Sequence, residues 1–304
     1  MSFNEMHAAD GSIRPCYAEV QQWVERSGIE GLNLRLEEAE AIFRRLGITF
    51  AVYGEGGDPE RLIPFDLLPR IFTAQEWRVL DRGIRQRARA LNAFLHDVYH
   101  RGEIIRADII PADIVYRNSA YKPEMVGFTP PGRVYSHIVG IDIVRTGPDS
   151  FEVLEDNCRT PSGVSYMLEN REIMTRMFPE LFMKGGVAPV DDYPGQLLAT
   201  LREVAPPACK GDPVVVVLTP GSLNSAYYEH SFLADLMGVE LVEPADLFVD
   251  EGRVWMKTTF GPKAVDVIYR RIDDEYLDPL VFRPDSLLGI PGIFNVYRNG
   301  GVTL

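Results

Sequence analysis

A continuously apolar run in the second half of the chain constrains the fold most. The segment PVVVVLTP, residues 213–220, is rich in β-branched side chains, which is typical of a strand that is covered on both faces. A helical segment that starts near Asn224 or Ser225 follows it, and GVELVE at 238–243 predicts another strand. A strand, a helix and a strand within about 30 residues favour a β-α-β unit with parallel strands. We therefore expect an α/β, or mixed α+β, fold.

The first hundred residues are predicted to be mainly helical. Apolar side chains recur at helical spacing in 19–26 and 32–46, and a strand at 48–53 and a loop at 54–60 follow. Thr73 and Glu76 form a T-x-x-E capping box before a long amphipathic helix that reaches Gly102. Several arginines of this helix predict a solvated face paired with acids or, alternatively, a stripe that faces an anion: Arg82, Arg85, Arg87 and Arg89.

Three regions are expected along the chain. Residues 1–110 form the mainly helical part, 111–210 contain a hairpin and further helices, and 211–304 contain the β-α-β unit. Residues 104–136 are predicted to be irregular because prolines interrupt every pattern there. Further strands are expected at 253–258 and 264–271, joined by a turn at FGPK.

A predicted hairpin places acidic side chains on one face of a sheet. The segment Gly147–Ser150 has turn chemistry, and a turn centred there pairs Asp142 with Glu155 and Gly140 with Asn157. Residues that lie opposite each other share a face, so Asp142, Glu155 and Asn157 are expected to project together. Their oxygens are ligands that Mg²⁺ prefers, although a solvated acidic face without a metal is the alternative. Gly140 is expected to leave room for a ligand beside the backbone.

The opposite face of this hairpin is predicted to be apolar and structural. Arg145 is expected to face Glu152 across the ladder as a cross-strand pair. The apolar positions of this face are Val139, Ile141, Ile143 and Leu154. A helix is then predicted from about Pro161 to Phe178. The segment TPSG at 160–163 opens that helix, and its N–H groups and hydroxyls suit a bound anion or, equally, an ordinary helix cap.

The charge and the cysteines limit the class of protein. The net charge is −13 and the pI is about 4.9, which argues against binding to nucleic acid or to an anionic membrane surface. The three cysteines are an odd number and lie far apart, so they predict neither a disulfide framework nor a zinc site. The first residues lack the apolar core of a signal peptide, and no apolar run reaches the roughly 20 residues of a membrane span. We expect a cytoplasmic protein.

The stretch VLEDNCRTPSGVSYMLENR, residues 153–171, resembles the circularly permuted ATP-grasp type 2 family, which is related to glutathionylspermidine synthetase. The resemblance extends over nearly the whole chain, through GITFAVYG, IPFDLLPR, EWRVLDRGIRQRARALNAFLHDVY, HIVGIDIVR, LTPGSLNSAYYEHSFLADLMGVELVE and VDVIYRRIDD. It implies an ATP-grasp fold and an ATP-dependent carboxylate–amine ligase. In such a reaction ATP phosphorylates a substrate carboxylate, and an amine attacks the acyl phosphate.

The resemblance also implies a set of site residues. The family's metal pattern, an Asp on one strand and Glu-x-Asn on the next, falls on Asp142, Glu155 and Asn157, with Mg²⁺ and ATP as cofactors. Catalytic contacts are expected from Arg159, Thr160 and Ser162. Position along the chain, and not the resemblance, gives the expected contacts to the cofactor: Gly163 opens a helix, and Asn224, Glu229 and His230 follow the C-terminal end of a parallel-type strand, where ligands bind in open α/β sheets. Arg271 is a further expected contact. His230 could equally be a hydrogen-bonded core residue, and because strand residues alternate only one of Arg270 and Arg271 can face the site.

Two positions depart from the synthetase relatives. Gly140 stands where those relatives have Arg, and Arg159 stands where they have Asp, so glutathione and spermidine are not implied as substrates. The expected partners are a small-molecule or peptide carboxylate and an amine. Family members continue beyond the last residues here, NGGVTL, and the resemblance implies that their nucleotide clamp lies in that further part. A catalytically inert binding or scaffold module, and a Mg²⁺-dependent phosphohydrolase, are the alternative functions.

Overall fold

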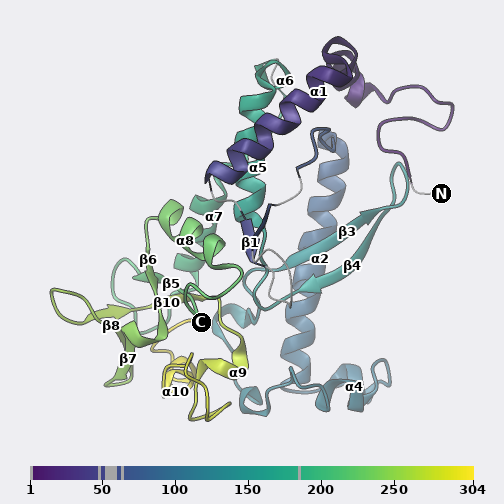
Figure 1. The fold of residues 1–304 in the computed structure, drawn as a ribbon. Helices are drawn as coiled ribbons and strands as arrows, with labels where there is room; N and C mark the ends of the chain where they lie inside the picture. Colours follow the sequence, from purple (N-terminus) through teal and green to yellow (C-terminus); the bar gives the residue numbers. More distant parts are fainter. Residues whose placement is uncertain (1–2, 47–48, 52–59, 63–64, 184–185) are drawn as a thin grey trace.

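The computed structural model describes residues 3–46, 49–51, 60–62, 65–183 and 186–304, as a mixed assembly of helices and small sheets (Figure 1). The strand predicted at 48–53 is present as β1 (Thr49–Ala51), which pairs antiparallel with β2 (Glu60–Leu62). Most of the loop predicted at 54–60 lies outside the described residues. The mixed α/β class is confirmed.

Two long helices form most of the N-terminal part. Helix α1 (Ala18–Leu46) joins both predicted helical segments across a kink at Gly28. The φ of Gly28 is 62°, which glycine adopts at little steric cost because it has no Cβ. Helix α2 (Ala74–Val98) begins with the predicted capping box, in which Thr73 accepts the N–H of Glu76 and Glu76 accepts the N–H of Thr73. It ends at Val98, before Gly102, because the chain turns there into the short helix α3 (Glu103–Arg106).

Helix α1 packs against a second pair of helices that follows the hairpin. These are α5 (Val164–Met177) and α6 (Pro179–Met183). Their shared core contains the buried residues Trp23, Phe43 and Phe178, with Trp23 and Phe178 in edge contact at 4.7 Å between ring centroids. The buried residues that α5 contributes to this core lie in its C-terminal half.

A parallel sheet forms the second core. Strand β5 (Val215–Leu218), helix α8 (Tyr227–Met237) and strand β6 (Glu240–Val242) make the predicted β-α-β unit, and β10 (Val267–Arg270) adds to the other edge of β5, also in parallel. All four residues of β5 are buried, as a continuous apolar run requires. Helix α7 (Tyr193–Glu203) packs with α8 on one face of the sheet.

The other face of the sheet meets a small antiparallel sheet of β7 (Leu247–Asp250), β8 (Arg253–Met256) and β9 (Lys263–Val265). The single strand predicted at 264–271 is divided between β9 and β10 at Asp266. The division has a polar cause, since the buried Asp266 carboxylate accepts the N–H of Val214 at 2.9 Å and binds Arg253 at 2.6 Å. Strand β7 was not predicted.

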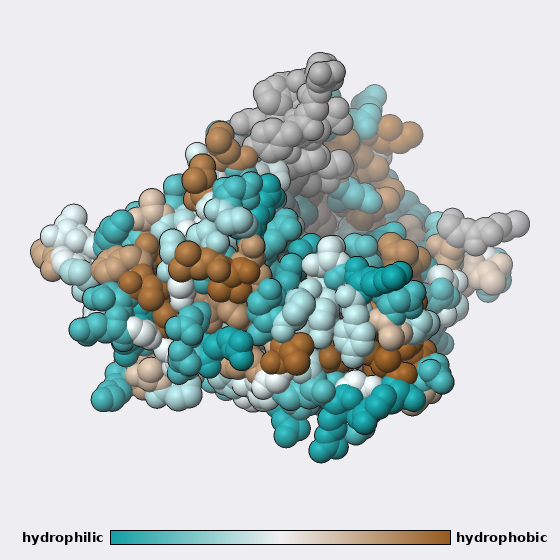
Figure 2. All heavy atoms as spheres, turned by 90° about the horizontal axis from the view of Figure 1, so that it is seen from below, coloured by the Kyte–Doolittle hydropathy of each residue, from teal (hydrophilic) through white to brown (hydrophobic). Residues whose placement is uncertain are grey.

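Short helices complete the described chain. They are η1 (Pro15–Tyr17), α4 (Ala112–Tyr116), η2 (Pro123–Met125), η3 (Pro131–Arg133), η4 (Pro244–Asp246), α9 (Asp274–Leu277) and α10 (Ile293–Arg298). Seen from the side that carries α4 and α10, the surface shows several separate apolar groups among hydrophilic side chains (Figure 2). Among the described helices, none is long and apolar enough to cross a bilayer. The boundaries of the three expected regions stay a prediction.

Candidate functional site

The predicted acidic face lies on a hairpin of β3 (Gly140–Arg145) and β4 (Phe151–Asn157). Asp142 lies opposite Glu155 and Gly140 lies opposite Asn157, as the sequence predicted. The side chains of Asp142, Glu155 and Asn157 are exposed on the same face, and the Asn157 amide donates to Glu155 Oε1 at 3.2 Å. The structure therefore brings the three predicted oxygen donors together.

The pairing nearer the turn differs from the prediction by one residue. The hairpin turns through a longer loop, in which Thr146 N–H donates to the Ser150 carbonyl at 3.1 Å, and Arg145 pairs with Phe151 rather than with Glu152. A β-bulge at Leu154 adds one residue to β4 and so restores the predicted register at Asp142. Leu154, expected on the apolar face, is 72% exposed because the bulge leaves it unpaired.

The inner face of the hairpin is held to α2 by ion pairs, a role that the sequence prediction missed. The Arg87 guanidinium donates to both oxygens of Asp156, at 2.7 and 2.6 Å. These bonds lower the pKa of the Asp156 carboxyl below its usual value. Arg85 pairs with Asp81 along the same helix, so for these two arginines the interpretation as a face paired with acids is correct.

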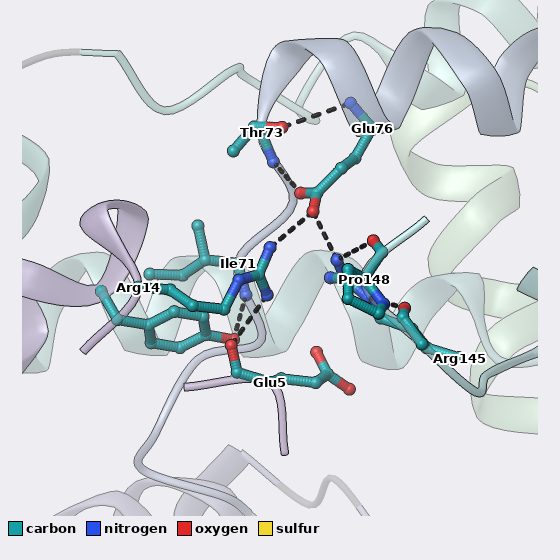
Figure 3. A network of polar contacts seen from close by, with 9 residues as sticks. Glu5, Arg14, Ile71, Thr73, Glu76, Arg145 and Pro148 are labelled. Carbon is teal, nitrogen blue, oxygen red and sulfur yellow. Dashed lines mark hydrogen bonds and ion pairs between the residues drawn. The ribbon is translucent and has the colours of Figure 1, made fainter. Parts of the chain in front are cut away.

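A second contact to α2 lies at the far end of the hairpin (Figure 3). The guanidinium groups of Arg14 and Arg145 converge on Glu76 Oε1, with Arg14 at 2.6 Å. Only 3% of the Arg145 side chain is exposed, and rings of Phe3 and Phe151 lie 5.1 and 5.2 Å from its guanidinium carbon. Burial alone would raise the pKa of Glu76, but hydrogen bonds from Thr73 and from the two arginines outweigh it and lower the pKa to about 2.

The expected space beside Gly140 is filled by the protein itself. A Cβ atom at this position would lie 2.9 Å from Pro161 Cβ, so the glycine permits the TPSG segment to pack directly on the hairpin. The preceding Cys158 carbonyl accepts the Ser136 hydroxyl at 2.7 Å. Gly140 thus admits a neighbouring segment instead of a ligand, which corrects the prediction.

The start of α5 holds an internal anion. Glu229 Oε2, on α8, accepts the N–H of Gly163 at 2.6 Å and both the N–H and the hydroxyl of Ser165 at 3.2 and 3.0 Å. Free N–H groups at a helix N-terminus favour a negative charge, and here a carboxylate of the same chain supplies it. The start of α5 therefore binds an anion, and that anion is the Glu229 carboxylate of the same chain, to which Gly163 donates.

Arg271 completes this buried network. Its guanidinium donates to Glu229 Oε1 at 3.2 Å, to the Pro161 carbonyl at 2.7 Å and to the Tyr269 hydroxyl at 3.1 Å. The Glu229 and Arg271 side chains are 1% and 2% exposed. The geometry therefore gives Glu229 and Arg271 a positioning role, since they fix Pro161, Gly163 and Ser165 against the parallel sheet.

The other expected cofactor residues have hydrogen-bond partners outside this network. The buried His230 shares a hydrogen bond of 2.9 Å between its Nδ1 and the Thr219 hydroxyl, and burial lowers its pKa to about 3, so the alternative of a neutral core histidine is correct. Asn224 is exposed and its side-chain oxygen accepts the N–H of Ala226 at 2.9 Å, before α8 begins. Ser162, one of the expected catalytic residues, is exposed on the TPSG segment.

A hollow of about 520 Å³ adjoins the end of β4. Asn157, one of the three predicted metal ligands, and Arg159 and Thr160, two of the predicted catalytic residues, line it. Arg159 is 55% exposed, and its nearest carboxylate is that of Asp273, at 3.9 Å.

The predicted metal ligands, Asp142, Glu155 and Asn157, fit a hard divalent cation, because two carboxylates and one amide oxygen point into one exposed region. Over the described ranges, no cluster of three or more His, Cys, Asp or Glu side chains could hold a metal, and the predicted set has two such residues plus Asn157.

The chain is similar to one protein family and to solved structures. A family model described as a circularly permuted ATP-grasp matches residues 69–304. Among solved structures, a glutathione synthetase-like effector from Globodera pallida in its apo form is 14% identical with a TM-score of 0.47, over 89% of this chain and 64% of that one.

Curated relatives match the chain from end to end. An uncharacterized protein of Synechocystis is 49% identical, with coverage of 99% of this chain and 63% of that protein. An uncharacterized protein of Mycobacterium tuberculosis is 48% identical, with coverage of 100% and 54%. A protein of Frankia casuarinae named putative glutamate–cysteine ligase 2-2 is 39% identical, with coverage of 98% and 36%. The chain therefore spans less than two thirds of each of these relatives, and it belongs to the family of circularly permuted ATP-grasp proteins.

Proposed function

We propose that this chain carries the metal-binding part of an ATP-dependent carboxylate–amine ligase that acts through an acyl phosphate. Membership of the ATP-grasp family supports the use of ATP, and the name of the Frankia relative, putative glutamate–cysteine ligase 2-2, supports ligase chemistry. The observation that carries the proposal is the direct opposition of Asp142 and Glu155 in the hairpin. Two like charges in that position are unfavourable unless a cation lies between them.

The residues that would hold Mg²⁺ are Asp142, Glu155 and Asn157. When bound, the metal would supply neutralisation of the phosphate charge that develops during phosphoryl transfer. The protein's contribution is to hold these oxygens in place. The bulge at Leu154 and the Arg87–Asp156 pair set the direction of β4, and thereby of Glu155 and Asn157.

The TPSG segment is suited to contact the reacting groups. Its backbone is fixed from behind by Glu229 and Arg271, which leaves the Arg159 guanidinium and the Ser162 side chain exposed. Preorganised donors of this kind stabilise charge that builds up in a transition state. We assign this role to Arg159, Thr160 and Ser162, with Glu229 and Arg271 as positioning residues.

The test is release of ADP from ATP in the presence of Mg²⁺, across a panel of carboxylates and amines. The proposal predicts that release requires both an acid and an amine, and that Asp142→Asn abolishes it. Asp149→Asn, a matched change in the exposed turn of the same hairpin, should leave the rate unchanged. Phosphate release without an amine would indicate a phosphohydrolase instead. No turnover with any pair, together with no binding of Mg-ATP, would indicate an inert scaffold.

A further inference from the structure

The hollow beside Asn157 has walls that are mainly aromatic. Tyr99 and Tyr135 stack with ring centroids 6.0 Å apart on one side, and Phe282 and Phe294 meet edge to face at 5.2 Å on another. Tyr297 also lines the hollow, and burial raises its pKa to about 12, so its hydroxyl stays neutral. The volume of the hollow, about 520 Å³, lies within the range of roughly 300–1,000 Å³ that is typical of small-molecule sites.

Both side-chain carboxylates that line the hollow are already paired. Asp156 accepts two hydrogen bonds from Arg87, and Asp274 binds Arg270. A carboxylate that is held in this way has little capacity left for the ammonium group of a ligand. The lining of the hollow therefore does not favour a cationic group.

The remaining charged side chains of the hollow are cationic. The Lys122 ammonium has the Ser119 carbonyl as its partner, at 3.1 Å, and the exposed Arg159 guanidinium lies 3.9 Å from the nearest carboxylate. Arg159 also stands two residues from Asn157, at the edge that the hollow shares with the acidic face. An aromatic interior with cationic groups at its edge suits an organic anion with an apolar body.

We propose that this hollow binds the acid substrate and that this acid is an apolar or ring-bearing carboxylate whose amino group, where it has one, is blocked. The carboxylate lies beside Arg159, next to the three oxygen donors, and the body lies among the aromatic rings. A free amino acid such as glutamate binds poorly, because its ammonium finds no unpaired side-chain carboxylate in the described lining. The assignment of this ligand as a substrate rests on the proposed ligase function, whereas its binding does not.

Binding of four probes to the 304-residue chain tests the proposal by calorimetry or ligand-observed NMR: N-acetyl-phenylalanine, its amide, phenylalanine and glutamate. N-acetyl-phenylalanine should bind at least about tenfold more tightly than the other three. Equal binding of the acid and its amide would overturn the proposal, as would tighter binding of glutamate or no binding of the blocked acid. Displacement of the acid by AMP would assign the hollow to a nucleotide and would also overturn it.

A variant pair separates the role of Arg159 from general effects. Arg159→Met should weaken binding of N-acetyl-phenylalanine about tenfold and leave binding of its amide unchanged. Arg176→Met is the matched control, since Arg176 is 56% exposed and pairs with Glu172 along α5, outside the hollow. Unchanged acid binding by the Arg159 variant would contradict the proposal. Binding of a divalent cation is measured without any acid, so failure of the hairpin site and failure of this inference are distinguishable.

Discussion

Arg87 of helix α2 holds Asp156 of strand β4 through two parallel hydrogen bonds, at 2.7 and 2.6 Å. Asp156 is the residue between Glu155 and Asn157, and alternation along the strand directs its side chain to the opposite face. A helix behind the sheet therefore sets the orientation of two predicted metal ligands in front of it.

Arg87→Met should lower the affinity for Mg²⁺ about tenfold, because supporting contacts of this kind typically contribute 10–100-fold to metal binding. Calorimetric titration of the chain with Mg²⁺ or Mn²⁺ measures the change. Arg85→Met is the control, since Arg85 pairs with Asp81 on the exposed side of the same helix. Equal loss of affinity in both variants would show that the charge of α2, and not the contact with Asp156, is responsible.

Glu76→Gln should destabilise the fold by about 3 kcal/mol at neutral pH, because it leaves the buried Arg145 without its counter-charge. The pKa of Glu76 falls from 4.5 to about 2 on folding. A lowered folded-state pKa contributes stability that is present above pH 4.5 and is lost as the pH falls toward 2. The difference in free energy of unfolding between the wild type and the variant should shrink over that interval, as urea titrations at several pH values would measure.

The matched control for this change is Glu172→Gln. Glu172 pairs with Arg176 along α5, and both side chains are more than half exposed, so its loss should cost less than about 1 kcal/mol at every pH. A Glu76→Gln cost that stays constant from pH 6 to pH 2.5 would contradict the assigned pKa.

The sequence predicted the acidic face of the hairpin but not the way in which the hairpin is held. The pairing of Asp142 with Glu155 follows from alternation and turn chemistry, which are local properties. The predicted pairing is correct although the predicted turn is too short. The longer turn and the bulge at Leu154 each shift the register by one residue, and the two shifts cancel. The residue types did not predict either feature; at the bulge, for example, Leu154 is a residue that is common in regular strands.

The partners of the charged residues are distant in the sequence and could not be predicted. Arg145 binds Glu76 from 69 residues away, and Gly163 binds Glu229 from 66 residues away. Local patterns indicated the capping role of Glu76 and the anion preference of the TPSG segment. Only tertiary packing decides which charged side chain binds at each place, here Arg145 and Glu229. The division of the final strand at Asp266 has the same origin.

Glu229→Gln should cost about 3–5 kcal/mol, because the buried Arg271 then has no counter-charge. Thermal and urea unfolding measure the loss. The double variant Glu229→Gln/Arg271→Met should be less destabilised than the sum of the two single variants, since removal of both charges leaves neither uncompensated. Additive losses would show that the two side chains do not act as a pair. Glu240→Gln, which loses an exposed pair with Lys263, is the control.

Gly140→Ala should destabilise the chain by about 1–3 kcal/mol, because the new methyl group would meet the rigid ring of Pro161. Gly83→Ala is the control within α2, where an added Cβ meets nothing within 4 Å. That control should stabilise the helix by up to about 1 kcal/mol. Similar unfolding free energies for the two variants would contradict the close packing of the TPSG segment on the hairpin.

Titration of the 304-residue chain with Mg²⁺ and with Mg-ATP tests the central claim most directly. The account predicts saturable binding of the cation to the wild type and to Asp149→Asn, and loss of that binding in Asp142→Asn and Glu155→Gln with their folds intact by circular dichroism. Wild-type binding that persists unchanged in both the Asp142 and the Glu155 variants, or no binding by the wild type, would contradict it.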